Sequence, residues 1–295
     1  MTTEVATNET TETPEALLPG LRLGTVHLIV SDLERSVSWY ERALGLRVHE
    51  RGTEVSLGDG IETTLVLHED PAAKRPGRHA GLYHYALLYP NRRELSFTLR
   101  RLAAAKAPLQ GMSDHGTHEA IYLADPDGIG IELAADRPRE QWPDLGELLR
   151  SGRASSPLDI EDLLDVTEHD DPTASVGEGL RVGHLHFHVA DVQEALTFYS
   201  DILGFDRKMN LRGAGFVSAN GYHHHLGLNE WQGKGAAPTP EHTAGLKEWT
   251  IVVPDAGAVE ATRRRFTSAS VPVEDVDNGF AVVDPWGMRA VIVTR

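Results

Sequence analysis

The alternation of apolar and polar positions divides the chain into short strands and amphipathic helices. Residues 26–30 form a run of mostly branched apolar side chains, which predicts a strand. Asp32 follows as a helix N-cap, apolar residues continue at helical spacing to Leu44, and Gly45 ends the helix. Further strands are predicted at 54–57 and 63–68. The same order then recurs, with a strand at 83–88, a helix at 92–105 and strands at 119–123 and 130–133.

This pattern returns in the second half of the chain at a constant spacing of 159 residues. Residues 24–46 match residues 183–205 in their Gly, His, Val, Asp, Tyr and Leu-Gly positions. The turn that starts at Asp125 matches the turn that starts at Asp284 at the same spacing. We infer a duplicated domain, and therefore four strand-helix-strands units in all.

We expect a disordered tail at 1–20, a first domain at 21–137 and a second domain at 180–295, each built of two units. Prolines and acidic residues mark 138–179 as the linker between them.

Composition narrows the possible partners. The net charge of −16 disfavours nucleic acid and anionic membranes. The chain has no cysteine, so thiolate metal sites and disulfides are excluded. No signal peptide or apolar run of membrane-spanning length is visible, and we expect a cytoplasmic protein.

Three polar side chains stand in the middle of apolar strand segments of the first half: His27, His84 and Glu132. A polar group in such a position must find a partner. Two imidazoles and one carboxylate form the donor set suited to Fe(II), or alternatively Mn(II), with positions left open for substrate. We therefore predict a metal site at these three residues.

Several short strings resemble the vicinal oxygen chelate superfamily, which includes glyoxalases, bleomycin-resistance proteins and extradiol dioxygenases. The likeness is greatest to two-domain enzymes of the catechol 2,3-dioxygenase type. The strings are Gly81-Leu82-Tyr83-His84, Ser113-Asp114-His115, Tyr122 to Gly128, Arg137 to Glu140 and Gly221 to Asn229. The resemblance implies an α+β fold in which four βαβββ modules pair into two half-open barrel domains.

The resemblance also implies an activity: ring cleavage of a catechol-type aromatic, with molecular oxygen as co-substrate, in aromatic catabolism. It assigns His27, His84 and Glu132 to the metal and His68, His115 and Tyr122 to catalysis, with His79 as a competitor of His68. The partner would be a small aromatic substrate, and homo-oligomers are expected.

The second half departs from the ligand pattern, because it aligns Val291 with Glu132 and Glu248 or Trp249 with His84. We therefore expect the active site in the first half. A second metal site at His186, His225 and Glu248 stays open.

Two other functions also stay open. A glyoxalase-type lyase or isomerase adds a carboxylate from the first unit's last strand, where Leu65, Val66 and Leu67 stand instead. A non-catalytic drug-binding protein of the bleomycin-resistance type would need no metal ligands.

Overall fold

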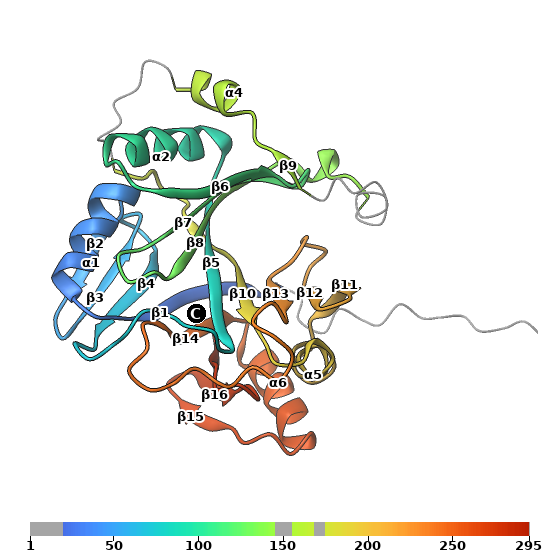
Figure 1. Ribbon diagram of the computed structural model, residues 1–295. Coiled ribbons are helices and arrows are strands. Elements are labelled where there is room, and N and C mark those ends of the chain that lie inside the picture. Colours follow the sequence, from blue (N-terminus) through green and yellow to red (C-terminus); the bar gives the residue numbers. More distant parts are fainter. Residues whose placement is uncertain (1–19, 145–154, 168–174, 295) are drawn as a thin grey trace, which may run out of the picture.

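The computed structural model describes residues 20–144, 155–167 and 175–294. It is an α+β fold in which strands fill the middle and helices lie at the periphery (Figure 1). The predicted tail, except for Gly20, lies outside the described residues. No helix of the described part is long and apolar enough to cross a bilayer.

Four units follow one another along the chain. Unit 1 comprises β1 (Arg22–Val30), α1 (Leu33–Trp39) with the π-helical turn Tyr40–Leu44, β2 (Arg47–Arg51), β3 (Glu54–Gly58) and β4 (Thr63–Glu69). Unit 2 comprises β5 (Gly81–Tyr89), α2 (Arg92–Ala104), β6 (Leu109–Asp114), β7 (His118–Ala124) and β8 (Gly130–Asp136).

A connecting segment holds a 3-10 turn (Arg139–Gln141), β9 (Ser156–Pro157) and α4 (Ile160–Asp165). Unit 3 comprises β10 (Arg181–His188), α5 (Val192–Leu196) with the π-helical turn Thr197–Ile202, β11 (Asp206–Leu211), β12 (Ala214–Ser218) and β13 (Leu226–Asn229). Unit 4 comprises β14 (Gly245–Val252), α6 (Ala256–Ser268), β15 (Glu274–Val276), β16 (Gly279–Val283) and β17 (Arg289–Val293).

Local sequence signals set the bounds of the first helix as predicted. The Asp32 carboxylate accepts a hydrogen bond from the Arg35 N–H at 2.9 Å, as an N-cap does. At the other end Gly45 takes a φ of 72°, a left-handed conformation that glycine adopts without steric cost.

The units pair across the sequence halves and not within them. One sheet has the order β15-β16-β17-β14-β1-β4-β3-β2 and joins unit 4 to unit 1. The other has the order β11-β12-β13-β10-β5-β8-β7-β6-β9 and joins unit 3 to unit 2. We expected units 1 and 2 to pair within 21–137, and units 3 and 4 to pair within 180–295. The sheet orders correct this expectation. The first strands pair antiparallel, β1 with β14 and β5 with β10.

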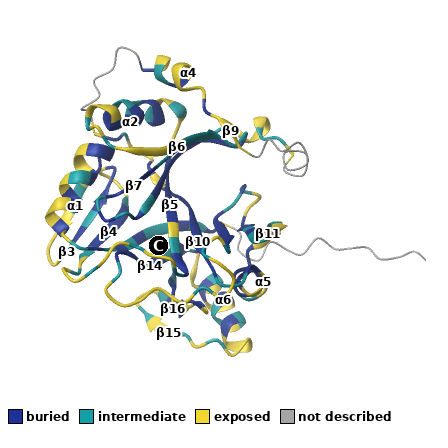
Figure 2. Cartoon of the chain, in the orientation of Figure 1, coloured by how far each residue is buried: buried dark blue, intermediate teal, exposed yellow. Residues whose placement is uncertain are grey.

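The two sheets share one apolar core, which Figure 2 shows as buried strands with exposed outer helix faces. This core contains two buried aspartates, Asp125 and Asp284, at equivalent positions of the two sequence halves. The Tyr40 hydroxyl donates to Asp125 Oδ2 at 3.2 Å, and the Tyr199 hydroxyl donates to Asp284 Oδ2 at 2.8 Å. Burial raises the pKa of each of the two aspartates to about 6.

Stability should therefore depend on pH through Asp284. The native carboxyl keeps its proton up to about pH 6, whereas an unfolded aspartate releases it near its ordinary pKa of 3.8. Native stability from this group is present at low pH and declines as pH rises through that window. In Asp284→Asn the free energy of unfolding should lack this pH-dependent decline, which amounts to about 3 kcal/mol because one pKa unit corresponds to about 1.4 kcal/mol.

Urea unfolding at pH 4 and pH 7 measures this effect. From pH 4 to pH 7, the unfolding free energy of Asp284→Asn should rise relative to that of the parent protein. Asp206→Asn, at an exposed carboxylate, should show no such change relative to the parent. A difference that stays constant with pH at Asp284→Asn would refute the raised pKa.

Candidate metal centre

The polar side chains of the sheet formed by units 2 and 3 gather in one row across its central strands. Ala86 on β5 pairs with Glu132 on β8 and with His184 on β10. Directly paired residues project from the same face of a sheet, and so do residues two apart on one strand. His84, Glu132 and His184 therefore share a face, and the short side chain of Ala86 leaves space between them.

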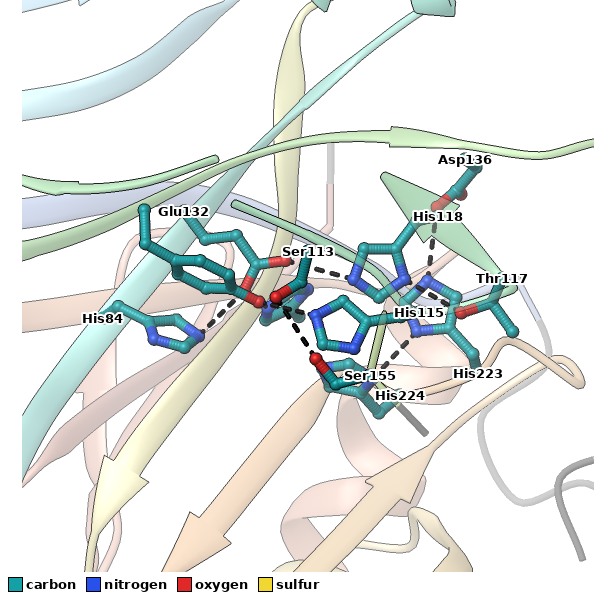
Figure 3. Close-up of polar contacts among 12 residues, drawn as sticks. His84, Ser113, His115, Thr117, His118, Glu132, Asp136, Ser155, His223 and His224 are labelled. Atoms are coloured by element: carbon teal, nitrogen blue, oxygen red, sulfur yellow. Dashed lines mark hydrogen bonds and ion pairs between the residues drawn. The ribbon is translucent and has the colours of Figure 1, made fainter. Parts of the chain in front are cut away.

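The Glu132 carboxylate is the centre of this arrangement (Figure 3). Its Oε2 lies 3.2 Å from His84 Nε2 and 3.1 Å from His184 Nε2. One ligand atom from each of the three residues lies within 4.8 Å of the other two. All three side chains are buried. Two imidazoles and a carboxylate thus converge from three adjacent strands.

These residues fit a divalent metal. Within the described part of the chain, the buried Nε2 of His84 makes no well-aligned hydrogen bond, although it lies 3.2 Å from Glu132 Oε2. Such a nitrogen is costly to bury unless a cation satisfies it. The set of two imidazole nitrogens and one carboxylate suits Fe(II) and Mn(II). Its three ligands leave room for further oxygen ligands.

Electrostatics keeps these groups in the protonation state that binds a metal. Burial alone would raise the pKa of Glu132, but His184, His118 and His84 together bring it well below its usual value. Burial lowers the pKa of His184. A carboxylate and a neutral imidazole at neutral pH are the forms that coordinate cations.

A cavity of about 430 Å³ opens over this cluster. The His115 ring nitrogen Nε2 lies 2.8 Å from the Tyr122 hydroxyl on its wall. Burial raises the pKa of Tyr122, which keeps the phenol protonated and able to donate a hydrogen bond. The remaining wall is largely aromatic or apolar and includes Tyr83, Met209, Leu211, Phe216 and Trp231.

The structure does not bring His27 to this cluster. His27 lies on β1 in the other sheet, where its Nδ1 is 3.0 Å from His68 Nε2 and 3.7 Å from Glu248 Oε1. The predicted ligand set is corrected at this residue, because β5 pairs with β10 of unit 3 and not with β1. His84 and Glu132 do lie together as predicted.

The catalytic candidates divide in the same way. His115 and Tyr122 line the cavity, as expected for residues that touch a substrate. The predicted catalytic role of His68 is corrected, because its ring lies beside His27 and away from the cavity. Its Nδ1 lies 3.0 Å from Glu54 Oε2 and 3.1 Å from Lys247 Nζ. Its competitor His79 is directed to the Ala80 carbonyl at 2.8 Å, outside the residues that line the cavity.

The second metal site considered at His186, His225 and Glu248 is also corrected. His186 lines the main cavity, while His225 is directed to Ser218 at 2.9 Å. Glu248 lies in the other sheet and accepts from Arg289 at 3.0 Å. The three residues therefore stand in separate environments.

Sequence reasoning did not single out His184 as a candidate ligand. The constant spacing aligns His27 with His186, and strand alternation places His184 and His186 on one face. Only the register of β10 against β5 shows which of the two lies beside Glu132. His184 pairs with Ala86, which in turn pairs with Glu132, whereas His186 pairs with His84. His118, His223 and His224 also line the cavity and were not singled out as site residues.

The chain belongs to the Glyoxalase/Bleomycin resistance protein/Dioxygenase superfamily, whose family model matches residues 22–133 and 181–289. This membership confirms the family resemblance that the short sequence motifs indicated. It also confirms the predicted α+β fold class.

Among individual proteins, the chain is 40% identical over 273 residues to the catechol-2,3-dioxygenase of Bacillus subtilis (strain 168), covering 89% of this chain and 93% of the relative.

Two solved structures share the fold at low sequence identity. A Bacillus subtilis protein described as a candidate dioxygenase has a TM-score of 0.62 at 14% identity, covering 92% of this chain and 84% of its own. Glyoxalase I from Zea mays has a TM-score of 0.55 at 14% identity, covering 93% of each chain.

Proposed function

We propose that this protein is a metal-dependent extradiol dioxygenase that cleaves the ring of a catechol-type aromatic. The observation that carries the proposal is the convergence of His84, Glu132 and His184 at the base of an aromatic cavity. The relative at 40% identity, named for this activity, supports it. We propose Fe(II), with Mn(II) as the alternative, and a small aromatic substrate.

The cavity has the size and chemistry for such a substrate. Its volume of about 430 Å³ lies within the range of roughly 300–1,000 Å³ typical of small-molecule sites. Aromatic side chains such as Tyr83 and Phe216 can pack against a ring in offset or edge-to-face geometry. His84, Glu132 and His184 would hold the metal at the cavity wall.

Held by His84, Glu132 and His184, a metal would supply the Lewis-acid and redox chemistry for the reaction of a catechol with molecular oxygen. The chain itself would position these reactants, which replaces an improbable encounter by proximity. The Tyr122 phenol, held beside His115 at 2.8 Å, would donate a hydrogen bond to oxygen atoms that gain negative charge. Both atoms of oxygen enter the product, a ring-opened hydroxymuconic semialdehyde, and no external reductant is required.

A glycine disfavours the glyoxalase-type alternative. The position on β13 that corresponds to Glu132 on β8 is Gly227, which pairs with His186 on β10. A Cβ atom at Gly227 would lie only 2.9 Å from the His186 ring, so a larger side chain has no space there. Unit 3 therefore supplies no carboxylate at the position that corresponds to Glu132.

The assay is direct. Protein loaded anaerobically with Fe(II) should consume oxygen and form a yellow product with at least one member of a panel of catechols. The same protein loaded with Ni(II) or Zn(II) should not isomerise hemithioacetals. Loaded protein that consumes no oxygen with any catechol would overturn the proposed reaction.

A further inference from the structure

A second group of donors lies beside the proposed metal centre and supplies none of its three proposed ligands. His118 on β7 pairs directly with Asp136 on β8, so the two side chains share the face that carries Glu132. His223, from the segment that precedes β13, reaches the same place. Its Nε2 lies 3.2 Å from Asp136 Oδ1 (Figure 3).

These three residues have cation-binding geometry of their own. One ligand atom from each lies within 4.8 Å of the other two. The His118 and His223 rings are stacked, with centroids 4.7 Å apart and planes inclined by 11°. Both imidazoles are buried and both line the cavity, so a cation that enters the cavity can reach them.

The local charge favours a cation. In the described part of the chain, Asp136 forms an ion pair only with His223 and accepts from the Tyr222 hydroxyl at 3.2 Å. No arginine or lysine of that part neutralises it. The Thr117 hydroxyl lies 2.9 Å from His118 Nδ1, which is the kind of outer partner that orients a ligating histidine.

The Glu132 carboxylate separates the two groups. Its Oε2 faces His84 and His184, whereas its Oε1 lies 3.1 Å from His118 Nε2. A carboxylate offers about four lone-pair sites on its two oxygens, and it can therefore serve groups on both sides at once. The two donor sets are neighbours with no residue in common.

We propose that His118, Asp136 and His223 form a second binding site for a divalent first-row transition cation, adjacent to the first. Two imidazoles and one carboxylate are the same donor type as in the first centre, so the second site should accept the same class of ion. The site does not depend on the proposed ring cleavage and would exist whatever reaction the cavity performs.

Metal stoichiometry tests the site without any turnover. The full-length protein, freed of metal and titrated with Co(II), should bind two equivalents, followed by elemental analysis and by the visible absorption of bound Co(II). Asp136→Asn, which is nearly isosteric, should bind one, and so should His223→Ala. His84→Ala should lose the other equivalent, and the double variant His84→Ala/Asp136→Asn should bind none.

His242→Ala is the matched control, because His242 also pairs with an aspartate, Asp70, at 2.8 Å but is exposed at the surface. It should keep two equivalents. Circular dichroism checks that each variant is folded, and His223→Gln provides a milder substitution. Saturation of the parent protein at one equivalent, or two equivalents in Asp136→Asn, would overturn the proposal. A failure of the oxygen assay would leave this result unchanged.

Discussion

His184→Ala should abolish turnover and metal binding at the first centre, whereas His27→Ala should leave both intact. His184 provides one of the two imidazoles that face Glu132, at 3.1 Å, and it is buried where water cannot replace it easily. A metal contributes several kcal/mol to catalysis, so its loss should lower kcat/KM by about 10³-fold or more. Elemental analysis and oxygen uptake measure the two effects separately.

His27 is the matched control because it is also a histidine in the middle of a unit's first strand. Its partners are His68 and Glu248 in the other sheet. The metal content of His27→Ala should equal that of the parent protein. If His27→Ala lost the first metal while His184→Ala kept it, the cross-paired ligand set would be wrong.

Tyr122→Phe should lower kcat by about 10²-fold while the metal content stays unchanged. The substitution removes a hydroxyl that lies 2.8 Å from His115 on the cavity wall and leaves the ring in place. Loss of one hydrogen bond to a developing negative charge typically lowers kcat by about 10²–10³-fold. Steady-state oxygen uptake at saturating catechol gives kcat, and elemental analysis gives metal content.

Tyr89→Phe is the appropriate control, since Tyr89 is buried on β5 but lies outside the cavity. Its kcat should match that of the parent. If Tyr122→Phe changed only KM, the hydroxyl would act in substrate binding and not on the reacting oxygens. An unchanged kcat would exclude the role that we propose for it.

The sequence was sufficient to predict the four units, but it was not sufficient to predict which units pair in a sheet. Helix caps such as Asp32 and Gly45 act locally, and their effect is visible in the order of residues. The pairing of β5 with β10 connects residues about a hundred positions apart. In a duplicated chain all four first strands have similar patterns, so several pairings satisfy the same apolar alternation.

The ligand set shows the consequence of this ambiguity. His84 and Glu132 belong to one unit, and their positions within that unit were sufficient to predict that they lie together. The third proposed ligand comes from another unit, and the choice between His184 and His186 depends on a strand register that sequence spacing cannot give. A shift of two residues keeps the same face but moves the imidazole along the strand.

Anomalous X-ray scattering from crystals of the Fe(II)-loaded protein would locate the iron relative to the two sheets. We expect an iron peak coordinated by His84, Glu132 and His184 on the sheet of units 2 and 3. An iron peak beside His27 and His68, with none at Glu132, would contradict it.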